Sequence, residues 1–182
     1  MLKEIVNELK EGKTILYPTD TVWGIGCDAT NEDAVKKIYK LKNREESKSL
    51  IILVASIDML KEYVTNISEK AIDIIKKAKK PTTIIYQNPK NLAKNTIASD
   101  NTIAIRIPQD DFCLQLIKKI GKPIVSTSAN ISGEPTPKSF SEISKAILNN
   151  VDYVVDLHQD KTTEKSSTIL KIDDDFVTVI RE

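Results

Sequence analysis

The first residues of the chain have the apolar spacing of an amphipathic helix. Leu2, Ile5, Val6 and Leu9 recur every three or four positions, and Gly12 stands where a helix C-cap belongs. The same periodicity and the capping residues predict further helices: one capped by Asn31, two around residues 57–65 and 68–78, one from Asp110 or Asp111 to Gly121, and one starting at the capping-box pair Ser139 and Glu142.

Short runs of Ile, Val, Leu and Thr between these helices predict strands. The expected strands are residues 14–17, 50–54, 82–86, 102–107, 123–127, 153–157, 167–172 and 176–180. Residues 87–101 are polar and predict a loop, and the aspartates 173–175 predict a hairpin turn. Because strands alternate with helices and the chain ends in strands, we expect one α/β domain over residues 1–182, a twisted mixed sheet flanked by helices. The apolar run 50–54 is typical of a strand covered on both faces.

Composition narrows the class of protein. The 182 residues carry 27 Lys and Arg against 26 Asp and Glu, and this near-balance argues against a protein held on nucleic acid by bulk charge. The two cysteines, Cys27 and Cys113, fit no disulfide or metal spacing, and the one histidine, His158, argues against a His-based zinc site. We expect no metal site, no signal peptide and no membrane span, and therefore a cytoplasmic protein.

The segment YPTDTVWGIG, residues 17–26, places hydroxyls and a carboxylate between two apolar runs. Its glycines suit close backbone approach or positive φ, while a polar turn that satisfies its own backbone is the structural alternative. The segment also contains the G-x-G-x-x-A pattern of a dinucleotide site at residues 24–29. That reading is poor, because PTDT separates the preceding strand from the glycines and the next helix starts only after Asn31.

Two further segments carry cationic side chains. Lys42, Arg44 and Lys48 follow the second predicted helix and could converge on a polyanion. With Glu45 and Glu46 among them, an ordinary solvated helix end is the better explanation of this segment taken alone. Arg106 lies inside an apolar strand, where an unpaired charge is costly, and shares a face with Thr102 and Ala104. A structural salt bridge and a site for a ligand carboxylate are both open at Arg106.

The segment PIVSTSANISGEPT, residues 123–136, is the most specific of the four. Its hydroxyls and the amide of Asn130 follow a buried strand, and such side chains with free backbone N–H groups suit phosphate or ribose. The sequence has no G-x-x-x-x-G-K-[ST] and no G-x-S-x-G, so any nucleotide is bound without a P-loop and no serine-hydrolase elbow is present.

Together these segments resemble the YrdC-like family of threonylcarbamoyl-AMP synthases. The resemblance rests on YPTDTVWGIG at 17–26, K-x-R at 42–44, RIP at 106–108 and STSANISG at 126–133, in the family's order and approximate spacing. Residues 166–170 and 179–181 are also similar to the family's last strands. The resemblance implies a single-domain form, without the C-terminal domain of longer members.

The resemblance implies a reaction and a site. L-threonine, bicarbonate or CO₂, and ATP with Mg²⁺ would give threonylcarbamoyl-AMP and pyrophosphate, and a separate tRNA-modifying complex would use the product. Lys42 and Arg44 would be the catalytic cations. The nucleotide site would comprise Arg44, Lys48, Thr102, Ser128, Asn130, Thr136 and Arg181. The threonine site would comprise Thr21, Arg106 and Ser126, with Arg106 facing the carboxylate.

The sequence departs from the family pattern at Glu45, Ser49, Leu53 and Asp110, which concerns loop shape and some threonine contacts. Two other functions are open. An RNA-binding accessory factor would use the basic residues of segments 36–44 and 76–80, and would bind RNA without responding to ATP; a weak RNA contact is also compatible with the enzyme. A carbamoyl-transfer domain would accept carbamoyl phosphate in place of bicarbonate.

Overall fold

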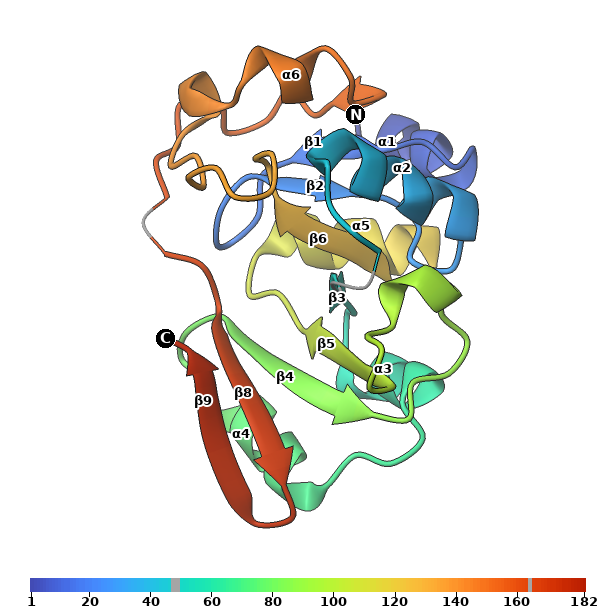
Figure 1. The fold of residues 1–182 in the computed structure, drawn as a ribbon, viewed down its shortest axis with the longest axis vertical. Helices are drawn as coiled ribbons and strands as arrows, with labels where there is room; N and C mark the ends of the chain where they lie inside the picture. Colours follow the sequence, from blue (N-terminus) through green and yellow to red (C-terminus); the bar gives the residue numbers. More distant parts are fainter. Residues whose placement is uncertain (47–49, 164) are drawn as a thin grey trace.

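A computed structural model describes residues 1–46, 50–163 and 165–182. In these parts of the chain nine strands form one twisted mixed sheet in the order β7-β1-β2-β6-β3-β5-β4-β8-β9 (Figure 1). The strands are β1 (Ile15–Tyr17), β2 (Gly24–Gly26), β3 (Ile51–Leu53), β4 (Thr82–Gln87), β5 (Thr102–Arg106), β6 (Ile124–Ser128), β7 (Tyr153–Val154), β8 (Thr168–Asp173) and β9 (Phe176–Arg181). The pairs β1–β7, β3–β5 and β4–β8 are parallel and the others antiparallel, which confirms the mixed sheet.

Six helices lie in the described parts of the chain, and four of them begin at side-chain caps that the sequence provides. They are α1 (Leu2–Lys10), α2 (Glu32–Lys42), α3 (Ile57–Tyr63), α4 (Glu69–Lys77), α5 (Asp111–Ile120) and α6 (Lys145–Leu148), with 3₁₀ turns at Lys94–Thr96 and Phe140–Glu142. Asn31 Oδ1 accepts the Ala34 N–H at 3.1 Å, and Asp110 Oδ1 accepts the Cys113 N–H at 2.8 Å. Gly121 ends α5 at φ +71°, as predicted for a C-cap glycine.

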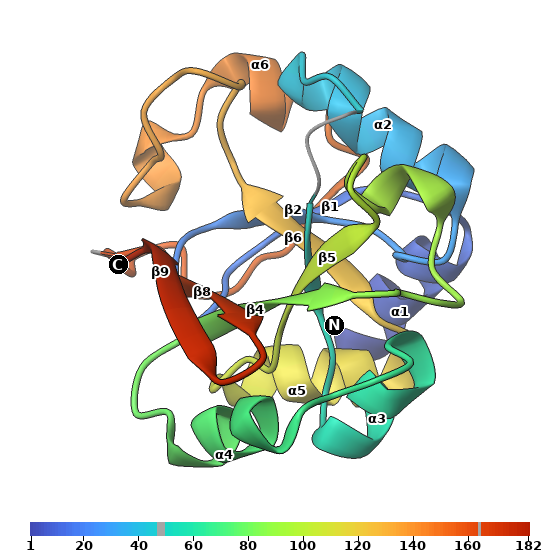
Figure 2. The same ribbon diagram turned by 60° about the horizontal axis from the view of Figure 1, so that its bottom comes forward.

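The two faces of the sheet are covered differently. Strand residues point alternately to opposite faces, and Leu16, Ile25, Ile52 and Ile105 pack on the face that α2, α3 and α4 cover. On the other face α1 and α5 cover one end, where Leu53 contributes to a second apolar cluster. Figure 2 shows α2 and α5 on opposite sides of β2 and β6. The remainder of the second face is left open to form the site.

The strand β2, which the sequence analysis did not predict, contains the G-x-G pattern. Gly24–Gly26 lies between β1 and β6, antiparallel to both, and α2 begins only at Glu32. The glycines therefore serve close packing and not a dinucleotide. A Cβ on Gly26 would lie 2.6 Å from the Val125 carbonyl oxygen and 2.7 Å from Tyr17 Cε1.

Two predictions for the C-terminal third are wrong in detail. Ser139 and Glu142 form no capping box, because the Glu142 carboxylate accepts the Lys138 N–H at 2.8 Å and only a 3₁₀ turn follows. Ile143 is then extended and buried, so that the next helix starts at Lys145. The strand predicted over 153–157 keeps only Tyr153–Val154, since the Leu157 N–H turns back to the Val155 carbonyl.

In the described parts of the chain no helix is both long and apolar enough to cross a membrane.

The tight packing at β2 can be tested by replacing its second glycine. Gly26→Ala should lower the free energy of unfolding by about 1–3 kcal/mol, because overpacking forces backbone shifts. Gly24→Ala is the matched control, since its Cβ would meet nothing closer than 3.3 Å and should cost less. Urea unfolding measures both, and equal losses would contradict the packing argument.

Candidate active site

The open part of the second sheet face is a cavity of about 340 Å³, which we call the central cavity. Its floor follows the strand register: Gly24 lies opposite Ser128, and Ile51 lies between Ser126 and Ala104. Gly24, Ala104 and Ser126 have small side chains, so the sheet surface is hollow where these strands meet. The cavity exists because α1 and α5 cover only the other end of this face.

The structure brings most of the predicted site residues together. Those that line the central cavity are Thr21, Arg44, Arg106, Ser126, Ser128, Thr136 and Arg181. They come from the PTDT loop, the segment after α2, β5, β6, the loop after β6 and β9. Cationic groups and hydroxyls from segments more than 100 residues apart therefore face one space.

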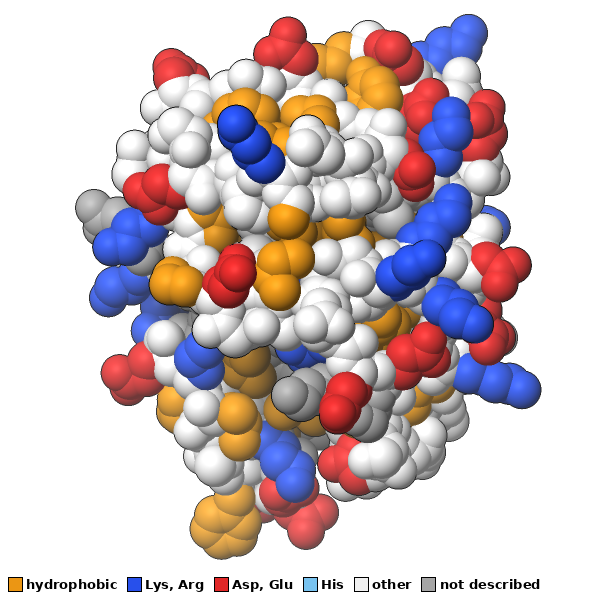
Figure 3. Space-filling model, turned by 45° about the horizontal axis from the view of Figure 1, so that its top comes forward, with side chains coloured by type: hydrophobic (Ala, Val, Ile, Leu, Met, Phe, Trp, Pro, Cys, Tyr) orange, Lys and Arg blue, Asp and Glu red, His pale blue; other side chains and the backbone are white. Residues whose placement is uncertain are grey.

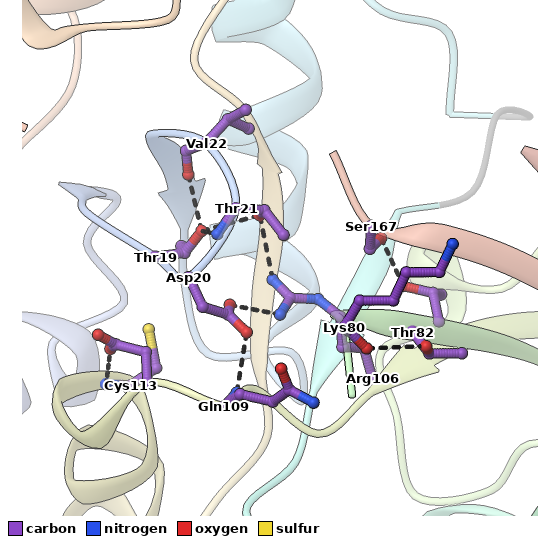
Figure 4. A network of polar contacts seen from close by, with 12 residues as sticks. Thr19, Asp20, Thr21, Val22, Lys80, Thr82, Arg106, Gln109, Cys113 and Ser167 are labelled. Carbon is purple, nitrogen blue, oxygen red and sulfur yellow. Dashed lines mark hydrogen bonds and ion pairs between the residues drawn. The ribbon is translucent and has the colours of Figure 1, made fainter. Parts of the chain in front are cut away.

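Arg106 is the most constrained charge in this cavity. It is only 3% exposed at the end of β5, and its Nη1 forms an ion pair of 2.5 Å with Asp20 Oδ1 (Figure 4). Its Nη2 donates to Thr21 Oγ1 at 3.3 Å, and the second Asp20 oxygen accepts the Gln109 N–H at 2.8 Å. Arg106 therefore forms the salt bridge that the sequence left as one of two possibilities. The same side chain also lines the central cavity.

The PTDT loop is held by its own hydroxyls. Thr19 Oγ1 accepts the Thr21 N–H at 3.0 Å, donates to the Val22 carbonyl at 2.7 Å, and lies 2.9 Å from Thr21 Oγ1. These bonds fix Thr21 at the cavity wall. The alternative of a polar turn that satisfies its own backbone is therefore correct for Thr19. Asp20 and Thr21, in contrast, face Arg106.

A second arginine, Arg181, lines the cavity from β9. Its Nε and Nη2 donate to the Ser167 carbonyl at 3.1 and 2.9 Å, and Ser167 Oγ lies 2.8 Å from Thr83 Oγ1. Burial, together with the positive charge of Arg106, lowers the pKa of Arg181. The two guanidinium groups thus act on the same space and together favour an anion there.

Lys42 is placed differently from the expectation of a phosphate ligand. Its side chain is 2% exposed and is not part of the cavity lining, and its ammonium donates to the Ser128 carbonyl. Burial, and secondarily the charge of Arg44, lowers the pKa of Lys42 to about 7. In this structure Lys42 therefore fastens α2 to the end of β6 beneath the cavity.

Two other predicted residues, Thr102 and Asn130, do not line the central cavity. Thr102 is the first residue of β5 and lies on the same face as Ala104 and Arg106. Its Oγ1 donates to Asp100 Oδ1 at 2.6 Å. Asn130 donates to the carbonyls of Ile131 and Glu134, and within the described residues its buried Oδ1 accepts no hydrogen bond. Lys48 and Ser49 lie outside the described residues.

Two residues of the site were not predicted, Asp20 as the partner of Arg106 and Ser167 as the partner of Arg181. The carboxylate of PTDT was visible in the sequence, but its pairing bridges 86 residues. Ser167 could have been suspected from the hydroxyl pair at 166–167, which also lines the cavity.

The comparison with known proteins decides the family. Residues 7–182 match the Sua5/YciO/YrdC family, whose description is "Telomere recombination". The chain belongs to this family. Over 184 residues it is 38% identical to a putative threonylcarbamoyl-AMP synthase of Methanocaldococcus jannaschii, covering all of this chain and 85% of that protein.

Other relatives of this Sua5/YciO/YrdC protein are longer. The threonylcarbamoyl-AMP synthase of Bacillus subtilis is 34% identical over 175 residues, which are 95% of this chain and 50% of that protein. The structure of Pyrococcus abyssi Sua5 complexed with L-threonine superposes with a TM-score of 0.88 at 28% identity, covering 99% of this chain and 53% of that one. The chain therefore spans about half the length of these two relatives.

The buried ammonium makes the stability of the protein depend on pH. Between pH about 7 and 10.5 the unfolded chain holds a proton on Lys42 that the folded chain does not. The free energy of unfolding should therefore rise with pH in this window. As pH falls to about 7, the part of the stability that comes from a neutral Lys42 should be lost. In Lys42→Met this rise should disappear, whereas Lys40→Met, at an exposed position of the same helix, should keep it. Urea unfolding from pH 6 to 9 measures the slopes, and identical slopes in all three proteins would refute the assignment.

Proposed function

We propose that this chain is an L-threonylcarbamoyladenylate synthase, a nucleotidyltransferase that forms threonylcarbamoyl-AMP and pyrophosphate from L-threonine, bicarbonate or CO₂, and ATP. The observation that carries this proposal is the central cavity, where Arg106 stands with hydroxyl groups on one side and Arg44 and Arg181 provide further cations. The curated relatives with this name support the same conclusion.

The threonine site in this proposal comprises Thr21, Arg106 and Ser126. A guanidinium is a planar fork that matches a carboxylate, and the contacts to Asp20 and Thr21 occupy only part of its N–H groups. The hydroxyls of Thr21 and Ser126 line the same space and suit the threonine hydroxyl. The Pyrococcus relative, which was crystallised with L-threonine, supports an amino acid in this fold.

The ATP site in this proposal uses Arg44 and Arg181 for the phosphates, with the hydroxyls of Ser128 and Thr136 beside them. Lys48, Thr102 and Asn130 remain assigned to it by resemblance alone. The described residues contain no group of three or more His, Cys, Asp or Glu side chains that could hold a metal ion. We therefore assign Mg²⁺ to the ATP phosphates, because this ion keeps several waters and few protein ligands.

The proposed reaction needs no covalent enzyme intermediate. The threonine amine attacks the carbon of CO₂ and loses a proton to give a carbamate; bicarbonate gives the same carbamate with loss of water. A carbamate oxygen then attacks the α-phosphorus, and pyrophosphate leaves. The side chains of the cavity align the two reactants and stabilise the charge that develops on the phosphate oxygens. Lys42 holds the end of β6, and with it Ser128, in place.

We propose further that the enzyme is cytoplasmic and passes its product to a separate tRNA-modifying complex. Figure 3 shows basic and acidic side chains interspersed over one face of the molecule, which does not favour the alternative of an RNA-binding factor. The formal net charge of +1 agrees with this.

Two lysine substitutions separate the roles that we propose for Arg106 and Arg181. Purified protein should release pyrophosphate from Mg-ATP only with L-threonine and bicarbonate. Arg106→Lys keeps the charge beside Asp20 but loses the fork, and should raise the KM for threonine about tenfold or more while changing the KM for ATP little. Arg181→Lys should do the reverse.

These kinetic results depend on folded variants, which thermal unfolding checks. A folded wild type without threonine-dependent pyrophosphate release would refute the synthase. Equal effects of both substitutions on both KM values would refute the assignment of Arg106 to threonine and Arg181 to ATP.

A further inference from the structure

Asp20 connects three parts of the site. It belongs to the loop between β1 and β2, its first carboxylate oxygen binds Arg106 at the end of β5, and its second accepts the Gln109 N–H just before α5. The side chain of Asp20 is only 10% exposed and that of Arg106 only 2%. An ion pair this deeply buried is costly to break, because either partner alone would be an uncompensated charge.

The ion pair also sets the direction of the guanidinium. Asp20 and Thr21 hold Nη1 and Nη2 from the side of the PTDT loop (Figure 4). Arg106 lines the central cavity, whereas Asp20 lines a neighbouring hollow that shares Thr21 and Ser166 with it. The carboxylate thus holds the arginine from the neighbouring hollow and leaves the cavity side for a ligand.

The two arginines differ in the charge beside them. Arg106 is neutralised by Asp20, while the contacts of Arg181 to Ser167 are to uncharged oxygens. Lys80, Lys161 and Lys165 line the same hollow as Asp20. Without the carboxylate, Arg106 and the three lysines of the neighbouring hollow would be cations without this counter-charge and would attract phosphate groups, since paired charges attract a polyanion far less than unpaired ones.

We propose that Asp20 is a positioning and specificity-determining residue. It aims Arg106 at the carboxylate of a zwitterionic amino acid, and its charge keeps the phosphates of the nucleotide away from Arg106. The proposal rests on the proposed function, because it assumes that an amino acid and a nucleotide share the cavity. It explains how one cavity with several cations can hold two ligands without exchanging them.

The test compares three variants by calorimetric titration with L-threonine, alone and in the presence of methylenediphosphonate. Asp20→Asn removes the charge with little change of shape, and Asp20→Glu keeps the charge but moves it. Asp28→Asn is the matched control: Asp28 is also buried, accepts the Thr30 N–H and hydroxyl, and pairs with Lys122 at 3.2 Å outside the cavity.

Asp20→Asn should bind L-threonine about tenfold or more weakly, because a charge-assisted contact to Arg106 is lost. The diphosphonate should displace threonine from this variant but not from wild type or Asp28→Asn. A merely structural role would weaken threonine binding without creating this competition, and that result would overturn the proposal.

Asp20→Glu decides the question if Asp20→Asn does not fold. This variant should lose threonine affinity and still exclude the diphosphonate, and displacement of threonine by the diphosphonate would overturn the proposal. Pyrophosphate release by wild type tests the proposed function separately. An active wild type with unchanged ligand preference in Asp20→Asn would refute only the role of Asp20.

Discussion

An arginine buried in a sheet needs a counter-charge, and this need organises the site. Arg106 is almost fully enclosed at the end of β5, so an unpaired guanidinium there would cost about 3–5 kcal/mol. Asp20 meets the need only if the PTDT loop folds over the strand ends. The same loop brings Thr21 to the cavity, and the second oxygen of Asp20 fixes the segment before α5.

The hollow itself follows from small side chains and incomplete helix cover. Gly24, Ala104 and Ser126 lie on the face that α1 and α5 leave partly open, and the cations of the cavity come from β5, β9 and the segment after α2. Lys42 shows a different use of charge. Burial, and secondarily the charge of Arg44, lowers the pKa of Lys42, while its ammonium donates to the Ser128 carbonyl and ties α2 to the strand that carries the hydroxyls.

Features that depend on neighbours in the chain could be predicted from the sequence. The caps at Asn31, Asp110 and Gly121 and eight of the nine described strands were recognised, because periodicity and capping are local. The strand β2 was missed since a three-residue Gly-Ile-Gly segment has no periodicity of its own. The capping box at Ser139 failed because the Glu142 carboxylate found another N–H.

The candidate residues could be named from their motifs, but their contacts could not. The sequence left open whether Arg106 forms a structural salt bridge or binds the carboxylate of a ligand. In the structure Arg106 forms an ion pair with Asp20 and also lines the central cavity. The burial of Lys42 beneath the cavity depends on packing between α2 and β6, which a single sequence does not reveal. Lys48 lies outside the described residues, so its predicted role is untested.

The most direct test of this account is a crystal structure of the protein with L-threonine and a non-hydrolysable ATP analogue. The account predicts the threonine carboxylate on Arg106, with Asp20 still bound to the same guanidinium, and the phosphates near Arg44 and Arg181. Threonine bound elsewhere, or phosphate oxygens on Arg106, would contradict it.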